Sequence, residues 1–532
     1  MDQAPSGHHQ EAVESPKLLA WINRHRLFTV IILAAAVVLL YVGVASLSEP
    51  GFPLDDSWIH QTYARNLAET GQLQYGTGVS SSGSTSPLWT LFLSIGYFLG
   101  LPYLWWAYFL GWLCLVWVAV SAMGLWQALW PENKSTTIWI GLAMVLTWPL
   151  VWAAASGMET LLFTALVLQI LRSYASLDDN RKGHTSVLGL LSGLVIVARP
   201  DGLVLAILVA FGLALNVLLG RAKPVNLLIF IGAGLLLLVP YFAFNRYLSG
   251  EWWPSTLYAK QAEYAFLWDQ PLPLRMGQLL LFSLGGPESG IRGISGVQLL
   301  LLPGIIIAAI SATRDDLSNR RLLQTIALLW AAGHIFIYAW RLPVTYQHGR
   351  YLWPVIPIWI IYGFAGWRQL LSKIEGRLVT EERGRFILST GIKIAFGTML
   401  LIFYFLGLQA YVTDVAFING EMVDTAIWLR EETQKDAVVA AHDIGAIGYF
   451  SQRSLIDLAG LISPEVIPLL KDESLVEEYV RESSANYLVT APGWPYEGIT
   501  NSDEVQQVYS TEYPWTQSLG FNNMAVYLLN DR

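Results

Sequence analysis

The sequence has little cysteine and little charge. Of its 532 residues one is a cysteine, Cys114, and 14% are charged, against about 25% in soluble proteins. A lone cysteine cannot form an intramolecular disulfide, so disulfide redox chemistry and cysteine-based metal sites are excluded. The chain also lacks a G-x-G-x-x-G loop that opens a helix, and it lacks a repeat with a period of about 20–50 residues. These absences argue against nucleotide binding and against a solenoid fold.

Hydrophobic residues are abundant and occur in long runs. They make up 54% of the sequence, in stretches of about 17–25 residues, the length that crosses the hydrocarbon core of a bilayer. The net charge of −8 comes largely from the last part of the chain, so it indicates neither nucleic-acid binding nor attraction to a membrane surface. The composition predicts an α-helical polytopic membrane protein with no nucleic-acid partner.

Basic residues between the hydrophobic runs predict the topology, because short cytoplasmic loops are enriched in Lys and Arg. The pattern predicts about eleven transmembrane helices in the plasma membrane, with the N-terminus inside and the C-terminus outside. This parity requires that the short run 87–101, which Gly96 and Gly100 interrupt, lies at the membrane interface and does not cross. The expected spans are residues 27–47, 104–128, 136–154, 157–174, 185–199, 202–219, 225–245, 296–312, 321–340, 350–368 and 388–410.

The same pattern divides the chain into three regions. Residues 1–26 are polar and predict a disordered cytoplasmic tail, and residues 27–410 form the transmembrane domain, with a first outer loop at 49–103. Residues 411–532 have the composition of a soluble protein and predict an extracytoplasmic α/β domain, with a helical stretch near 464–482. The segments that read as strands are DAVVAAHDIGAIGYFS, SLIDLAGLI, ANYLVTAP, VQQVYSTE and AVYLLND.

Polar side chains are expected to gather on the outer face. Two adjacent carboxylates, Asp55 and Asp56, follow the first span, and charge beside a bilayer is costly and marks a functional site. Asp56 and His60 are four residues apart, so a helix would place them on one face. Carboxylates combined with Arg and Lys suit hydroxyl deprotonation and phosphate recognition. The further candidates that the topology puts on this face are Arg65, Glu159, Arg199, Lys260, His348, Arg350 and Tyr351.

Each of these groups also has a purely structural interpretation. The aspartate pair is suited to capping a helix. Glu159 and Asp201 lie where helices are expected to start, so an interaction with the helix dipole is the alternative role of each. Arg199 and Arg350 are long enough to extend toward the membrane interface from within the bilayer.

Several short strings carry a family resemblance through their order along the chain. They are DDSWIHQTYARNLA, TSPLW, SGMET, ARPDG and HGRYLWP. Together they resemble the GT-C glycosyltransferase superfamily, in particular polyprenyl-phosphate-dependent bacterial enzymes such as arabinofuranosyl- and mannosyltransferases. The likeness covers the hydrophobic part of the chain and extends into the last domain through DIGAIGYFS and LIDLAGL. It implies an acidic residue of the first outer loop that acts at a membrane-level cavity, and a sugar donor carried on a polyprenyl phosphate.

The resemblance implies that Asp55, the earlier acid of the pair, is the general base. Asp56 then orients the acceptor, holds His60, or binds a divalent cation such as Mg²⁺ or Mn²⁺ together with Asp55. An outward-facing enzyme needs a donor delivered through lipid, and the anionic leaving group of that donor suits stabilisation by Arg199, Lys260 and Arg350.

The expected function is transfer of a hexose or pentose from a polyprenyl-phosphate donor to a hydroxyl of a cell-envelope glycan, glycolipid or protein. A lipid or glycan transporter or flippase is an alternative, although such a protein would carry ionisable groups within its spans, and these spans have few. A noncatalytic scaffold with the same fold is the other alternative, because a fold does not imply a function.

Overall fold

The computed structural model describes most of the chain, including every segment predicted to span the membrane. The described residues are 24–76, 79–177, 182–286, 296–313, 318–377, 382–503, 505–518 and 520–529. The predicted N-terminal tail lies outside these residues up to residue 23.

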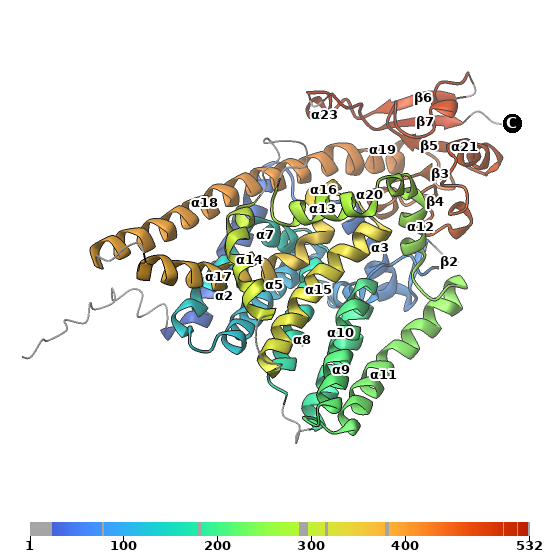
Figure 1. Cartoon of the computed structure of the whole chain (residues 1–532). Coiled ribbons are helices and arrows are strands. Elements are labelled where there is room, and N and C mark those ends of the chain that lie inside the picture. The colour runs from blue at the N-terminus through green and yellow to red at the C-terminus, as the bar shows by residue number, and fades with distance from the viewer. Residues whose placement is uncertain are drawn as a thin grey trace, which may run out of the picture.

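The body of the protein is a bundle of apolar helices (Figure 1). Among the described residues, six helices are long and apolar enough to cross a membrane, and a bent helix pair adds a seventh span. The predicted spans all fall on helices, but some of these helices are short, and the number of about eleven crossings stays a prediction. The bundle helices are α2 (Arg26–Ala45), α5 (Tyr103–Leu129), α6 (Thr137–Leu146), α7 (Trp148–Ala155), α8 (Thr160–Ala175), α9 (Lys182–Ala198), α10 (Leu203–Leu218), α11 (Pro224–Ser249), α14 (Leu302–Thr313), α15 (Asn319–Arg341), α17 (Ile356–Arg377) and α18 (Glu382–Phe417).

One predicted span is broken in the structure. The sequence predicts a single helix over 136–154, but α6 and α7 meet at an angle of 54°. Thr147 between them is extended (φ −74°, ψ 110°), and Pro149 in the first turn of α7 has no N–H to donate back into α6. The prediction of one continuous helix is therefore wrong here, and the proline is the physical reason.

Short elements connect the bundle helices. The apolar helix α4 has 12 residues, about 18 Å of rise, which is less than the roughly 30 Å of a hydrocarbon core. It is too short to cross, in agreement with the parity argument. These elements are α3 (Asp55–Thr70), β1 (Gln74–Gly76), β2 (Val79–Ser80), α4 (Pro87–Phe98), η1 (Lys134–Thr136), η2 (Pro200–Gly202), α12 (Ser255–Glu263), η3 (Ala265–Asp269), α13 (Leu272–Ser283), η5 (Val297–Leu301), α16 (Tyr346–Gly349) and η6 (Arg350–Val355).

The last part of the chain forms a small α/β unit, drawn in red at the upper right of Figure 1. Its five-stranded sheet has the order β4-β3-β5-β7-β6; β3 pairs in parallel with β4 and β5, whereas β7 pairs antiparallel with β5 and β6. The elements are η7 (Ile418–Val423), α19 (Asp424–Glu432), β3 (Val438–Ala441), α20 (Gly445–Phe450), β4 (Ser454–Asp457), η8 (Pro464–Val466), α21 (Glu473–Glu482), β5 (Tyr487–Thr490), α22 (Glu497–Thr500), β6 (Val505–Ser510), α23 (Pro514–Ser518) and β7 (Ala525–Leu529).

Two details of this unit differ from the sequence analysis. The segment DAVVAAHDIGAIGYFS holds a strand, β3, but its second half is helix α20, whose first N–H groups bind a carboxylate of the first outer loop (below). The composition changes at residue 411, yet α18 runs through this position and continues through η7 into α19. The bundle is thus joined to the α/β unit by continuous helix and not by a flexible linker.

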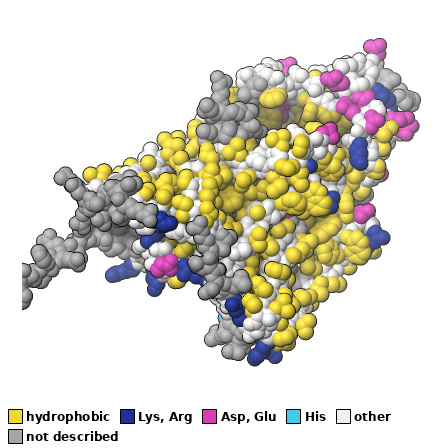
Figure 2. Space-filling model, in the orientation of Figure 1, with side chains coloured by type: hydrophobic (Ala, Val, Ile, Leu, Met, Phe, Trp, Pro, Cys, Tyr) yellow, Lys and Arg dark blue, Asp and Glu magenta, His cyan; other side chains and the backbone are white. Residues whose placement is uncertain are grey.

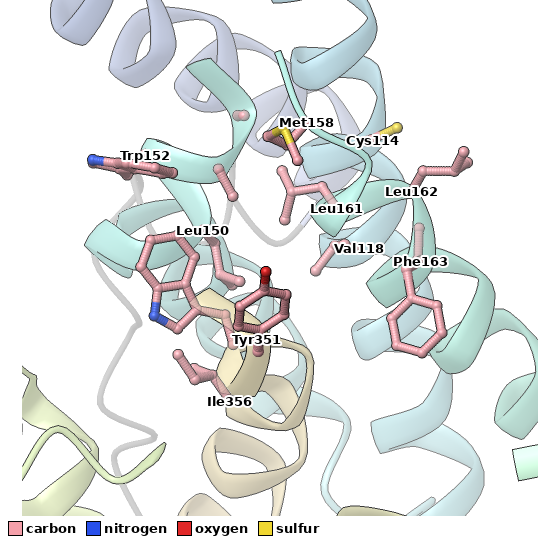
Figure 3. Close-up of a cluster of buried hydrophobic side chains, with 14 of the residues drawn as sticks. Cys114, Val118, Leu150, Trp152, Met158, Leu161, Leu162, Phe163, Tyr351 and Ile356 are labelled. Carbon is pink, nitrogen blue, oxygen red and sulfur yellow. The ribbon is translucent and has the colours of Figure 1, made fainter. Parts of the chain in front are cut away.

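Charged and hydrophobic side chains occupy different parts of the surface, and the interior is apolar. Hydrophobic side chains cover the middle of the body in Figure 2, Asp and Glu gather on the α/β unit, and a group of Lys and Arg lies along the opposite, lower edge. Inside, side chains of α5, α7, α8, η6 and α17 form one apolar cluster (Figure 3). Tyr351 belongs to this cluster and also lines the main cavity, so the core helps to hold that part of the cavity wall.

Candidate active site

One cavity of about 470 Å³ brings together residues from six separate parts of the chain. Six of the ten predicted site residues line it, together with apolar and aromatic side chains of α10, α12 and α15. The six are Asp56, Glu159, Arg199, Lys260, Arg350 and Tyr351. The six residues lie close together, as expected if the topology places them on the same side of the membrane.

Two side chains of the first outer loop bind backbone carbonyl oxygens of the SGMET turn and hold the loop over the bundle. The Ser57 hydroxyl of α3 donates to the Ser156 carbonyl oxygen (2.6 Å), and the Trp89 indole of α4 donates to the Gly157 carbonyl oxygen (2.7 Å). Gly157 has a φ of +74°, and a Cβ there would collide with the Phe52 ring. The SGMET turn is thus a fixed support that presents Glu159 and α3 to the same space.

Asp56 is the acidic centre of the cavity. Its Oδ2 accepts hydrogen bonds from Lys260 Nζ (3.2 Å) and from the Arg350 guanidinium, and Lys260 also donates to the Tyr351 hydroxyl (3.0 Å). Burial alone would raise the pKa of Asp56, but the charges of Lys260 and Arg350 and their hydrogen bonds outweigh burial and hold this pKa well below its usual range. Asp56 is therefore ionised at neutral pH and shares one oxygen between two cations.

A second group of charges faces the same cavity. The Glu159 carboxylate lies 3.3 Å from His60 Nε2 and 3.7 Å from Arg199 Nη1. Arg199 Nε donates to Asp201 Oδ1 (3.2 Å), and the Tyr338 hydroxyl donates to Asp201 Oδ2 (3.2 Å). Glu159 is the N-cap residue of α8 but makes no side-chain cap hydrogen bond to it; its carboxylate faces His60 and Arg199.

Arg350 reaches the cavity because the preceding turn is unusual. Gln347, His348 and Gly349 have φ values of 52°, 60° and 67°, and left-handed backbone is strained for residues other than glycine. A Cβ at Gly349 would collide with the Phe282 ring. This turn reverses the chain after α15 and directs Arg350 inward, while His348 points away and lies 2.8 Å from Asp414.

Asp55, the predicted base, makes different contacts from its neighbour. Its two carboxylate oxygens accept from the backbone N–H groups of Gly445 and Ala446 in α20, both at 2.7 Å, and it does not line the cavity. Burial and the nearby Asp443 raise the pKa of Asp55 to about 7, against the lowering effect of the two backbone hydrogen bonds. Its contacts tie the first outer loop to the α/β unit.

Three more predicted residues lie outside the cavity lining. His60 stands behind Glu159 and also contacts the Thr90 hydroxyl (3.5 Å). Arg65 Nη1 donates to the Tyr449 carbonyl oxygen (3.0 Å), because nine residues of helix turn it about 180° from Asp56. His348 is the third, because its turn directs it away from the cavity and toward Asp414.

The structure does not arrange Asp55 and Asp56 as a pair of metal ligands. The oxygens of Asp55 are held by backbone N–H groups and Oδ2 of Asp56 by two cations. Within the described part of the chain, no group of three or more His, Cys, Asp or Glu side chains is placed to hold a metal ion. These side chains are not arranged to hold the divalent cation expected from the sequence.

Sequence reasoning missed three polar residues of this region as site residues. Tyr338 lines the cavity, Asp201 does so next to Arg199, and buried His334 behind them lies 2.8 Å (Nε2) from the Tyr351 carbonyl oxygen. A signal was present, since His334 and Tyr338 are one helical turn apart within an apolar span, where polar groups mark function.

The cavity adjoins the lipid-facing surface of the bundle. Its wall includes Leu203 and Ile207 of α10 and Trp340 of α15, whose side chains are 38%, 58% and 47% exposed. Large apolar side chains exposed on membrane helices face hydrocarbon. A molecule with a lipid tail thus has an apolar side entrance to the charged groups.

The sequence resembles the GT-C glycosyltransferase superfamily, and a bundle of apolar helices is the fold that this resemblance implies. Solved structures bear this out for the fold, because the chain superposes on members of that superfamily over most of its length. The chain has the GT-C fold.

Two of these structures show how far the similarity extends. One is the archaeal oligosaccharyltransferase AglB from Archaeoglobus fulgidus, in complex with an inhibitory peptide and a dolichol-phosphate. It has a TM-score of 0.62 and 11% identity, over 88% of this chain and 70% of that chain. The other is ArnT from Cupriavidus metallidurans in the apo state, with a TM-score of 0.57 and 14% identity, over 96% of this chain and 98% of that chain.

A match to a family model covers the end of the chain. A family model described as Domain of unknown function (DUF8728) matches residues 411–527. It begins at the residue where the composition changes and includes the helical connection as well as the sheet. A search of curated proteins found no match.

Proposed function

We propose that this protein is a membrane glycosyltransferase that moves a hexose or pentose from a polyprenyl-phosphate donor to a hydroxyl of a glycan, glycolipid or protein on the outer face of the plasma membrane. The observation that carries the proposal is the Asp56–Lys260–Arg350 cluster in a cavity with a lipid-facing side. Two cations suit the phosphate of the donor, and a carboxylate beside them suits the acceptor hydroxyl. The GT-C fold supports this assignment.

The base in this proposal is Asp56, in place of the Asp55 that the sequence predicts. Asp56 lines the cavity, whereas the carboxylate of Asp55 is held by α20. Without donor, the two cations keep Asp56 ionised and weakly basic. A donor phosphate would compete for Lys260 and Arg350 and would thereby raise the proton affinity of Asp56.

The reaction follows from these positions. Asp56 takes the proton of the acceptor hydroxyl as its oxygen attacks the anomeric carbon. The bond between that carbon and the phosphate oxygen breaks on the opposite side of the sugar, and the polyprenyl phosphate leaves with the bonding electrons. Lys260, Arg350 and Arg199 stabilise the leaving charge, and inversion at the anomeric carbon is the expected stereochemistry.

The test compares three carboxylate variants in proteoliposomes supplied with polyprenyl-phosphate sugars and an acceptor glycan. We expect Asp56→Asn to lower turnover by roughly 10²–10⁴-fold, the usual contribution of a general base. Glu69→Gln changes an exposed carboxylate on the same helix and is expected to leave turnover unchanged. Asp55→Asn is expected to lower the melting temperature, because an amide oxygen replaces a carboxylate that accepts two N–H groups.

Two results would contradict the proposal. Equal turnover of wild type and Asp56→Asn would remove Asp56 from the chemistry, and full loss in Asp55→Asn with an unchanged melting temperature would return the role to Asp55. Movement of the lipid-linked sugar across the bilayer without a glycosidic product would instead favour a flippase.

A further inference from the structure

A second, smaller pocket lies beside the candidate active site. It has a volume of about 260 Å³, and among the residues that line it are Arg275, Gln278 and Leu281 of α13. Pro343 and Thr345 line it from the segment after α15, while Arg341 and Leu342 of the same stretch line the larger cavity. The end of α15 and the residues after it thus line the two spaces in turn.

The guanidinium of Arg275 has unmet hydrogen-bonding capacity. The residue is 8% exposed, and among the residues that the structure describes its buried Nε and Nη1 have no hydrogen-bond partner. Two arginines of the larger cavity, Arg199 and Arg350, differ because each faces a carboxylate. Burying a cation with unmet donors is unfavourable unless an anion accompanies it.

The lining of the pocket suits an anion. Its other polar members, Gln270, Gln278 and Thr345, are uncharged, and no carboxylate belongs to the described lining. Amide N–H₂ and hydroxyl groups are donors that complement a guanidinium around an oxyanion. The planar fork of arginine matches two oxygens of a phosphate.

The surroundings point to a lipid as the carrier of that anion. Leu281 lines the pocket and is 39% exposed, and Leu274 and Leu280 on α13 are 52% and 43% exposed. Phe266 and Trp268, just before α13, are 64% and 40% exposed. A short helix with this apolar surface is expected to lie at the membrane interface, where lipid headgroups are found.

We propose that the Arg275 pocket binds the phosphate group of a membrane lipid, at a site separate from the Asp56 cavity. The guanidinium donates to the phosphate oxygens, and the acyl or prenyl chain lies along the exposed leucines of α13. The volume fits a headgroup and excludes a whole lipid. This proposal does not depend on the transferase function, because it concerns binding alone.

The test measures binding to the full chain in detergent micelles by the shift of its melting temperature. The probes are dioleoyl phosphatidic acid, phosphatidylcholine and inorganic phosphate. We expect phosphatidic acid to raise the melting temperature of wild type, with the other two giving smaller shifts. Arg275→Gln is expected to weaken the apparent affinity for phosphatidic acid by about tenfold or more, the effect of losing one charged hydrogen-bonding group.

Controls separate this result from misfolding and from general charge. Arg246→Gln removes an exposed arginine at the end of α11 and should respond like wild type. Without added lipid, Arg275→Gln should melt at or above the wild-type temperature, because the change removes a buried unpaired charge.

The probes also decide the source of the anion. If inorganic phosphate shifts the melting temperature as much as phosphatidic acid does, and Arg275→Gln abolishes both shifts, the pocket binds an anion. The assignment of a lipid as its ligand would then be overturned. Equal responses of wild type and Arg275→Gln to phosphatidic acid would overturn the site itself.

Discussion

At the scale of single residues, the two adjacent aspartates have different surroundings. Consecutive residues of a helix point about 100° apart, so Asp55 faces α20 while Asp56 faces Lys260 and Arg350. The sequence shows two equal carboxylates. It does not show which one meets the cations, because those partners lie more than two hundred residues further along the chain.

The pH dependence of turnover should report the charges around Asp56. Lys260→Met removes one of the two cations that lower the pKa of Asp56, so this pKa rises and the acid limb of the kcat/KM profile moves to higher pH. At neutral pH the lost contact to the donor phosphate should lower kcat/KM by about tenfold or more. The measurement is kcat/KM against pH in proteoliposomes.

The control for this prediction is Arg246→Gln, which removes a cation outside the cavity and should leave the profile in place. An acid limb that stays at the wild-type pH in Lys260→Met would show that Asp56 does not control that limb.

At the scale of elements, helix α12 connects the cavity to the α/β unit. It carries Lys260 into the cavity and Glu263 to the other side, where the Glu263 carboxylate lies 3.4 Å from His442 Nε2, just after β3. His442 Nδ1 lies 3.4 Å from Asp443. This contact joins two elements that lie far apart in the sequence.

This contact predicts a pH-dependent stability. Burial lowers the pKa of His442, but the hydrogen bonds and charges of Asp443 and Glu263 outweigh burial and raise this pKa well above its ordinary value. The folded state therefore favours the protonated ring. The stabilisation is complete below the unfolded pKa of about 6.5 and is lost as the pH rises through the higher folded pKa.

We expect His442→Gln to cost roughly 1–3 kcal/mol at neutral pH and much less in alkali. Melting temperatures of both proteins from neutral to alkaline pH test this, with His184→Gln, an exposed histidine of α9, as the control. A constant difference between wild type and His442→Gln at every pH would contradict the assignment.

At the scale of the whole molecule, sequence patterns predicted both the helices and which distant residues lie close together. Hydropathy located the helices, and the parity of Lys- and Arg-rich loops placed Asp56, Glu159, Arg199 and Arg350 on one face, where the structure brings them into one cavity. Features that depend on backbone geometry were not predictable. The left-handed turn before Arg350 is an example, because Gln347 and His348 take positive φ values that their residue types do not indicate. The bend at Thr147 differs, because Pro149 marks it in the sequence although the hydropathy pattern continues across it.

The proposed orientation predicts which surfaces a reagent reaches from outside the cell. Cys114 is buried, so the wild-type chain should not react with a membrane-impermeant maleimide. Glu69→Cys, at the exposed end of α3, should be labelled in intact cells, and Lys134→Cys, in the exposed loop after α5, only after permeabilisation. The reverse labelling pattern would show that the chain has the opposite orientation in the membrane.

The apolar side of the cavity between α10 and α15 also determines which concentration of donor sets the rate of encounter. A donor that enters past Leu203, Ile207 and Trp340 arrives by diffusion in two dimensions, within the plane of the bilayer. Its rate of encounter then follows its mole fraction among lipids and not its amount per volume of water. Dilution with inert phospholipid at constant donor should therefore slow turnover, whereas dilution with buffer should not.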